Sequence, residues 1–432
     1  MRNRDWFLGK KSVPALCMAV AVFLMVGCSS SSKGEAIDLM PAPAIYSEFV
    51  NPFEKDVLPP STIYYATNRA PAVEGELAYS SLRGGVLRFG AASIKMGEGD
   101  FSWEEAKRIS LLKNRTDKYP LKVESVNEYG VLGSSLNGFV AKDFNEVGVE
   151  TTGKEFARHI DEKLSRSKRK DVFVYVHGYK VDFNNPILVT AELWHFLGYD
   201  GAFIAYSWPS TPRTLAYLSD LETAELSSYQ FRAFLEFLAK KTDAERIHIV
   251  GYSAGTRIVD KALFQLTLAN RHVSKEGLKE LKLGHVMLIG SDMDGAIFAA
   301  NIREGMLDIV EDLSVYVSDS DSAVAVAEWL FDWGRLGQVS REMSVPVKSF
   351  LEANPKLRVI DVTGAADADA GNGHGYFRDS PWVSSDILMT LMYDLPPEER
   401  GLAKDVDMPI WEFPEDYQQR LLEKLQVKLK PQ

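Results

Sequence analysis

The chain has 432 residues, which at roughly 150 residues per domain allows one large α/β domain with additions, or two or three domains. Hydrophobic residues make up 46% of the chain and charged residues 25%, so the composition is that of a globular protein and excludes a collagen-like, wholly disordered or polytopic membrane protein. The formal net charge of -11 argues against a nucleic-acid partner, because phosphate binding needs a basic face.

Residues 1–27 have the pattern of a secretory signal peptide. Four basic side chains precede a fourteen-residue apolar stretch at residues 13–26, whereas a membrane-spanning helix needs about 20 apolar residues. The two cysteines of the chain, Cys17 and Cys28, lie in or just after this stretch. The rest of the chain therefore has no disulfide, no cysteine-ligated metal and no thiol nucleophile.

Residues 25–28, Met-Val-Gly-Cys, resemble the bacterial lipobox. The resemblance implies cleavage before Cys28 and lipidation of its thiol, and several acyl chains would form a stable membrane anchor. Ser29 follows the cysteine, a pattern similar to that of lipoproteins sorted to the outer membrane of the bacterial envelope. An uncleaved signal anchor is the alternative.

Residues 28–60 are predicted to be a lipidated tether, because Ser, Pro and Ala are frequent there and apolar residues follow no period. Short β-type runs separated by Gly-containing turns then predict a β-rich, antiparallel N-terminal lead-in over residues 61–150. Its strands are expected at residues 62–67, 85–89, 91–96 and 121–129.

Residues 151–395 alternate short, nearly continuous apolar runs with longer helix-period segments, as expected of βαβ units around a buried parallel sheet. Strands are predicted at residues 172–176, 202–207, 246–252, 285–289, 313–317 and 357–362. Helices are predicted at residues 185–198, 223–241, 256–270, 294–303, 322–333 and 380–393. Right-handed crossovers would make this a three-layer α/β core. Residues 396–432 are predicted to be a tail that packs over the core and ends in an amphipathic helix at 417–428.

The segment Gly251-Tyr252-Ser253-Ala254-Gly255 is a G-x-S-x-G motif between a predicted strand and a predicted helix. A serine on so sharp a turn stands above the carboxyl edge of the sheet, and its neighbours two residues away must be very small for the chains to pass. Ser253 is therefore the predicted nucleophile. The motif also occurs by chance, as a simple glycine turn, but the strand before it and the helix after it argue against that alternative.

A serine hydroxyl needs a base, and the base needs an orienting carboxylate. Of the seven histidines, His374 lies in a glycine-rich loop after the last predicted strand of the core, where the chain order Ser, acid, His places the base. The others fall in or beside predicted strands and helices, and His177 is expected to organise its own loop. A solvent-exposed loop histidine is the alternative for His374.

Two loops that follow strands offer the acid. Asp319 and Asp321 follow the strand at 313–317, and Asp292 and Asp294 follow the strand at 285–289. Aspartates in such places also cap helices. Asp321 is favoured, and Asp319, Asp292 and Asp294 remain alternatives.

An oxyanion formed during acyl transfer needs two N–H donors in place before the reaction. Ala254 supplies one, because it follows the nucleophile, and Tyr179 is expected to supply the other, because Gly178 lets the chain turn tightly after the strand at 172–176. Trp208 is expected either to wall the pocket or to pack in the core, and Tyr217 and Asp220 are further candidates for capping the site.

Five segments together are similar to those of a bacterial branch of α/β-hydrolases of unknown function, which share FATNR-, HGF-, SWPS- and GHS-like sequences. They are residues 65–69, 174–179, 207–210, 251–255 and 373–375. The resemblance implies an α/β-hydrolase three-layer sandwich with a mostly parallel central sheet, and a Ser-Asp-His triad in which Asp321 occupies the loop after the late strand. The chain departs from the family where Tyr252 replaces the commoner His and Tyr179 the commoner Phe.

These features predict a lipid-anchored extracytoplasmic serine hydrolase that cleaves a small-molecule or lipid ester through an acyl-enzyme. No phosphate-binding loop, H-E-x-x-H motif or dinucleotide fingerprint occurs in the chain, so no metal or organic cofactor is expected. A peptidase or thioesterase with the same triad is one alternative. A catalytically idle scaffold that acts as an envelope binding or assembly protein is another. No pattern in the sequence indicates an oligomeric state.

Overall fold

The computed structural model gives the fold of most of the chain after residue 35. The chain divides into residues 1–30 and 31–432, and every described residue belongs to the second part. The predicted signal peptide, Cys28 and the predicted helix at 322–333 lie outside the described residues. The described residues are 36–46, 51, 53, 62–73, 78–97, 103–112, 118–135, 146–211, 217–321, 345–405 and 408–428.

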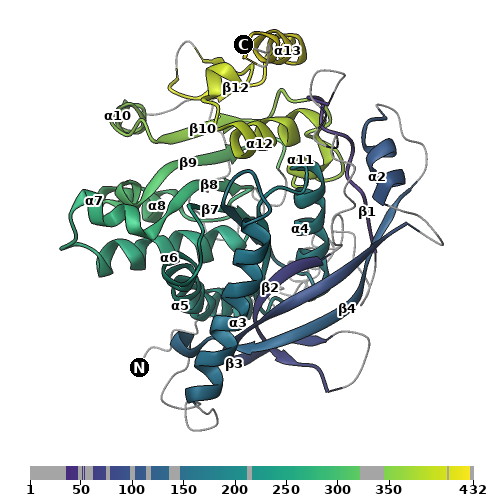
Figure 1. The fold of residues 1–432 in the computed structure, drawn as a ribbon. Helices are drawn as coiled ribbons and strands as arrows, with labels where there is room; N and C mark the ends of the chain where they lie inside the picture. The colour runs from purple at the N-terminus through teal and green to yellow at the C-terminus, as the bar shows by residue number, and fades with distance from the viewer. Residues whose placement is uncertain are drawn as a thin grey trace, which may run out of the picture. The chain divides into compact units, whose positions relative to one another are not determined.

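The described strands form one sheet of twelve in the order β1-β4-β3-β2-β6-β5-β7-β8-β9-β10-β12-β11 (Figure 1). Their bounds are β1 Ile37–Asp38, β2 Thr62–Pro71, β3 Tyr79–Met96, β4 Pro120–Val131, β5 Asp171–Val176, β6 Ala202–Ser207, β7 Arg246–Tyr252, β8 Leu283–Ile289, β9 Val310–Val317, β10 Leu357–Asp361, β11 Ala403–Lys404 and β12 Trp411–Glu412. The strands from β2 through β6, β5, β7, β8 and β9 to β10 pair in parallel. The predicted mostly parallel central sheet is thus confirmed.

Helices cover both faces of this sheet. They are α2 Trp103–Ser110, α3 Glu146–Leu164, α4 Asn184–Phe196, α5 Tyr217–Lys241, α6 Gly255–Ala269, α7 Lys275–Leu278, α8 Gly295–Arg303, α10 Val345–Ala353, α11 Tyr376–Asp379, α12 Pro381–Tyr393 and α13 Tyr417–Lys428. Short 3₁₀ turns lie at Gly133–Ser135, Lys279–Leu281, Met306–Ile309 and Pro397–Glu399.

The period-two pattern of the strands divides the core between the two faces. In β5, Val172, Val174 and Val176 belong to the buried cluster that also contains residues of α3, α5, α6 and α8. Phe173 and Tyr175 of the same strand point the other way and belong to the buried cluster that also contains residues of α4, α11, α12 and α13. A strand buried on both sides reads as a continuous apolar run, which is why the sequence predicted these strands well.

The lead-in strands are part of the same sheet. β3 pairs antiparallel with both β2 and β4, as predicted, and β2 joins the central sheet by pairing in parallel with β6. The two strands predicted at 85–89 and 91–96 are one long strand, β3. Its pairing with β4 shifts register between Phe89 and Gly90, and this local irregularity, not a turn, is what the glycine marks.

The prediction of a tether without structure is wrong for residues 36–46. Ile37–Asp38 pairs with β4 as β1, Ile45 is fully buried, and the Met40 N–H donates to Glu192 Oε1 at 2.8 Å. The segment has a turn at residues 44–45, and isolated apolar side chains and hydrogen bonds to side-chain acceptors hold it on the domain. It therefore shows neither the period of a strand nor that of a helix, and the sequence pattern did not reveal it.

The C-terminal residues extend the sheet and cover its end. β12 pairs in parallel with β10, and β11 pairs antiparallel with β12. The predicted amphipathic helix is α13, Tyr417–Lys428, and it buries Tyr417, Leu421 and Leu425.

Candidate active site

The serine of the G-x-S-x-G motif sits on the turn between β7 and α6. Ser253 has φ 52°, a left-handed conformation that costs energy for a residue with a side chain. Its N–H donates to the Ile289 carbonyl at the end of β8 at 2.9 Å. A Cβ on Gly255 would overlap the carbonyl oxygens of Val176 and His177. The chain can therefore make this turn only with glycine at position 255, and the half-buried Ser253 lies at the carboxyl edge of the sheet.

His374 and Asp321, far apart in the sequence, meet at the same edge. His374 Nδ1 lies 2.7 Å from Asp321 Oδ2, and only 1% of Asp321 and 9% of His374 is exposed. The hydrogen bond to a buried carboxyl group orients the imidazole: in the neutral ring the proton on Nδ1 points toward Asp321, and Nε2 is then the basic nitrogen.

Tyr252, the residue before the serine, packs the loop that contains His374 against the turn between β7 and α6. Its ring packs on the imidazole with centroids 5.0 Å apart, and on the ring of Phe377 with centroids 4.8 Å apart. The Tyr252 hydroxyl donates to the His374 carbonyl at 3.3 Å. Tyr252 thus connects the loop that contains His374 to the turn that contains Ser253.

The other three candidate acids have different partners. Asp292 accepts a hydrogen bond from Arg257 Nε at 2.9 Å. Asp294 caps α8, where it accepts from two N–H groups at 2.9 and 3.0 Å. Asp319 is exposed. Of the four carboxylates, Asp321 is the one that the structure brings to His374.

The loop after β5 approaches the serine closely. A Cβ on Gly178 would lie 2.7 Å from Ser253 Cβ and 3.3 Å from its Oγ, so only glycine lets this loop pass over the nucleophile. Tyr179 follows directly, and Ala254 follows the serine at the start of α6. The predicted oxyanion donors thus belong to two segments that flank Ser253.

His177 organises this loop, as predicted. It is fully buried, and its ring nitrogens lie 2.7 Å from the Gly178 carbonyl and 3.0 Å from the Trp208 carbonyl. Burial, and next the charge of Arg69, lower the pKa of His177 well below its usual range. Trp208 is also fully buried, stacks on His177 and donates its indole N–H to the His177 carbonyl at 2.7 Å. Trp208 therefore packs in the core and does not wall a pocket.

The remaining histidines lie elsewhere. His248 and His285 stack on each other near the amino ends of β7 and β8, the opposite end of the strands from Ser253. His195 is buried in α4 beside Ser110, and His159 stacks on Tyr129. His272 lies between α6 and α7.

Neither of the two further candidates for capping the site is shown to do so. Asp220 is buried and accepts hydrogen bonds from the N–H and hydroxyl of Thr211 at 2.7 and 2.9 Å. The side chain of Tyr217 lies outside the described residues.

Sequence reasoning missed two residues that support the His374–Asp321 pair. Gly290, just after β8, has φ 56°, and a Cβ there would lie 3.0 Å from His374 Cε1 and 3.4 Å from Asp321 Oδ2. Its N–H donates to the Tyr376 hydroxyl at 2.6 Å, and Tyr376 donates to the Tyr316 carbonyl at 3.0 Å. A lone glycine after a strand gives no signal of such a contact, because the partner is more than 80 residues away in the sequence.

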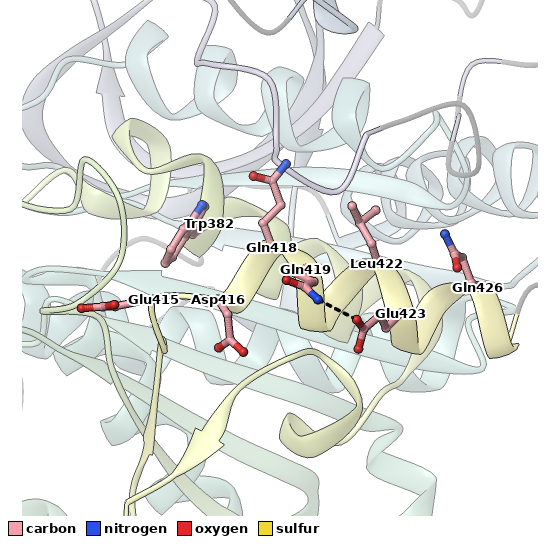
Figure 2. A pocket seen from close by; sticks show the side chains of 8 residues that line it. All are labelled: Trp382, Glu415, Asp416, Gln418, Gln419, Leu422, Glu423 and Gln426. Atoms are coloured by element: carbon pink, nitrogen blue, oxygen red, sulfur yellow. Dashed lines mark hydrogen bonds between the residues drawn. The ribbon is translucent and has the colours of Figure 1, made fainter.

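Other features of the described residues lie apart from this site. A groove runs along Trp382 and residues 415–426, where Glu415, Asp416 and Glu423 make its lining acidic (Figure 2). It includes none of the predicted site residues.

No group of three or more His, Cys, Asp or Glu side chains suited to a metal ion occurs in the part of the chain that the structure describes. Among the described helices, none has the length and apolar character needed to cross a membrane.

The parallel sheet between helix layers, with a strained serine between a strand and a helix, defines the class of the protein as an α/β-hydrolase. A family model described as "Alpha/beta hydrolase of unknown function (DUF900)" matches residues 152–391. The chain belongs to this family. No curated protein matches the chain.

Two solved structures of esterase 2 from Thermogutta terrifontis are similar to part of the chain. The structure phosphoramylated by tabun has a TM-score of 0.29 and 12% identity, and the match covers 52% of this chain and 81% of the esterase. The apo form also has a TM-score of 0.29 and 12% identity, with 53% of this chain and 86% of the esterase covered.

Proposed function

We propose that this α/β-hydrolase is a serine hydrolase that cleaves carboxylic esters through an acyl-enzyme. The observation that carries the proposal is the buried His374–Asp321 hydrogen bond of 2.7 Å in a loop that packs on Tyr252, next to the strained Ser253. A serine, a histidine and a carboxylate are the three parts that activate a hydroxyl at neutral pH in serine hydrolases.

In the proposed reaction, Ser253 Oγ attacks the ester carbonyl carbon while His374 Nε2 takes its proton. The negative oxygen of the tetrahedral intermediate accepts hydrogen bonds from the amides of Tyr179 and Ala254, and the N-terminus of α6 adds a favourable dipole. The C–O bond then breaks, and His374 returns the proton to the leaving alcohol. Water, deprotonated by His374, releases the acid and regenerates Ser253. Asp321 accepts the hydrogen bond from Nδ1–H throughout, and its negative charge stabilises the imidazolium that forms when Nε2 takes the proton.

A fluorophosphonate probe tests the nucleophile directly. We expect one covalent adduct on the wild-type protein, mapped by peptide mass spectrometry to Ser253, and none on Ser253→Ala, because the probe reacts only with an activated serine. Circular dichroism should give the same spectrum for both proteins. A folded wild-type protein that takes no label would contradict the proposal and favour the idle scaffold. Esters of increasing acyl length, and a matched amide and thioester, then separate an esterase from a peptidase or thioesterase.

We also propose that the mature enzyme is anchored in the bacterial envelope through lipidated Cys28, with the outer membrane as the favoured site. The support is the signal-like sequence of residues 1–28. Seven residues lie between Cys28 and Ala36, so the chain between the two can span at most about 28 Å when fully extended. The domain would then act close to the membrane surface, where lipid esters are available.

The anchor predicts a change of cell fraction. In a Gram-negative host, the wild-type chain is expected in the detergent-soluble membrane fraction, and Cys28→Ala is expected to lose lipidation, because the thiol is the acylated group. The measurement is labelling with an alkyne fatty acid, followed by membrane flotation. Cys17→Ala is the matched control and should still be labelled. Equal labelling of Cys28→Ala and the wild type would exclude Cys28 as the lipidation site.

A further inference from the structure

Arg69, on β2, is a fully buried arginine whose side chain reaches three separate segments of the chain. One of these segments is the loop of residues 177–182, which passes over Ser253. The guanidinium donates from Nη2 to the carbonyls of Val181 at 3.0 Å and Asp182 at 3.4 Å. Arg69 therefore binds the backbone of the loop that contains Tyr179.

The same guanidinium also binds the segment that follows β6. Nε donates to Ser207 Oγ at 3.1 Å, and Nη1 donates to the Ser210 carbonyl at 3.4 Å. A further bond from Nη1 reaches the Ser80 carbonyl of β3 at 3.3 Å. Only the planar, five-donor fork of arginine can bridge acceptors spread in this way.

A contribution to stability alone does not explain why the charged side chain of Arg69 is buried. Within the described residues no carboxylate oxygen forms a salt bridge with Arg69, and its hydrogen-bond acceptors are neutral oxygens. The charges of Asp182 and Asp220 act on the guanidinium without direct contact, while burial lowers the pKa of Arg69 to about 10. Burying a cation costs free energy that an apolar residue of similar size would avoid. What Arg69 adds is a defined distance between the 177–182 loop and residues 207–210.

Further hydrogen bonds connect the same two segments. Ser210 Oγ donates to the Val181 carbonyl at 2.9 Å and accepts the Val181 N–H at 3.2 Å. The Trp208 indole donates to the His177 carbonyl at 2.7 Å. The 177–182 loop is thus fixed at both ends, while Gly178 between them touches Ser253.

We propose that Arg69 is a positioning residue for catalysis: by holding the 177–182 loop on residues 207–210, it sets the place of the Tyr179 amide in the oxyanion site without touching the substrate. This inference rests on the proposed serine hydrolase function. Because an oxyanion donor acts only when charge develops in the transition state, its displacement lowers kcat and leaves KM nearly unchanged.

The test compares Arg69→Lys with Arg83→Lys, using p-nitrophenyl butyrate and a fluorophosphonate probe. Arg83 is the cross-strand partner of Arg69 in the β2–β3 pair, but its side chain donates to Thr223 Oγ1 at 2.8 Å, away from the 177–182 loop. We expect Arg69→Lys to lose about 10- to 100-fold in kcat with KM within about threefold, and Arg83→Lys to match the wild type.

Active-site titration separates positioning from damage to the fold, because kcat is then expressed per reactive serine. Exogenous guanidinium at low, non-denaturing concentration should restore part of the activity of Arg69→Ala, and the same addition should not raise the activity of the wild type. If Arg69→Lys does not fold, Ser210→Ala decides: it removes the hydroxyl that holds Val181 and should lower kcat in the same way.

Several results would overturn the inference. The first is an Arg69→Lys variant whose kcat per titrated serine equals that of the wild type. The second is an Arg69→Lys variant with a raised KM and an unchanged kcat. If Arg69→Lys is unfolded, an unchanged kcat in Ser210→Ala would overturn the inference. In these cases the wild type still reacts with the probe at Ser253, so the proposed function stands. A wild type that neither reacts nor turns over the ester overturns the proposed function, and the role of Arg69 with it.

Discussion

Replacing Asp321 by asparagine is expected to lower kcat for an ester substrate by about 10³- to 10⁴-fold, with the fold intact. The carboxylate accepts the His374 Nδ1 proton at 2.7 Å and so keeps Nε2 free to take the serine proton. Asparagine has almost the same size, but its amide N–H₂ can donate to Nδ1 and favour the tautomer that carries the proton on Nε2. That imidazole cannot accept a proton from Ser253.

The neighbouring aspartates provide matched controls for this prediction. Asp319→Asn changes an exposed carboxylate two residues away in the same loop and should leave kcat within about twofold of the wild type, as expected of a surface substitution. Asp292→Asn weakens the contact with Arg257 and should affect stability more than kcat. Steady-state kinetics at saturating ester and circular dichroism measure both effects. A large loss of kcat in Asp292→Asn or Asp319→Asn, with an active Asp321→Asn, would assign the acid differently.

The turn that contains Ser253 could be predicted because the residues that form it are close together in the sequence. A continuous apolar strand, a G-x-S-x-G turn and a helix-period segment follow one another within 25 residues. The predicted strand at 246–252 is β7, and the helix predicted at 256–270 is α6, Gly255–Ala269. Each element is specified by its own residues, so a single sequence is enough to place Ser253 between them.

The acid could not be settled from the sequence alone. β8 and β9 are neighbouring parallel strands, and both end in Asp-containing loops at the same edge of the sheet. What distinguishes the loops is three-dimensional: Arg257 from α6 binds Asp292, α8 uses Asp294 as its cap, and His374 reaches Asp321. Only the tertiary structure brings these partners together.

The contacts that hold the 177–182 loop could not be predicted from the sequence either. The sequence singled out residues 65–69 and 207–210 by family resemblance, and it gave a physical argument only for Trp208, as a wall of the pocket or a core residue. In the structure, both Arg69, which precedes Val181 in the chain, and Ser210, which follows it, donate hydrogen bonds to the Val181 carbonyl. The Arg69 contacts join residues separated by 11 to 141 positions, and no periodicity or spacing rule predicts contacts over such distances.

Gly290→Ala is expected to lower kcat by about 10- to 100-fold, because an error of about 1 Å in the position of a catalytic group can cost that much. A Cβ at position 290 would lie 3.0 Å from His374 Cε1 and 3.2 Å from Nδ1. Both contacts are tighter than normal packing, so the imidazole must shift away from Asp321 or from Ser253. The positive φ of 56° adds a cost of roughly 1–2 kcal/mol for any residue with a side chain.

Gly371→Ala separates these two effects. Gly371 also has a positive φ, 65°, but no atom lies within 4 Å of its added Cβ. Both variants should therefore lose a similar free energy of unfolding in urea, and only Gly290→Ala should lose kcat. If kcat falls equally in both, backbone strain in the His374 loop and its surroundings explains the loss. If kcat is unchanged in Gly290→Ala, the position of the imidazole does not depend on the space that Gly290 leaves, and the close approach of β8 to His374 has no part in the reaction.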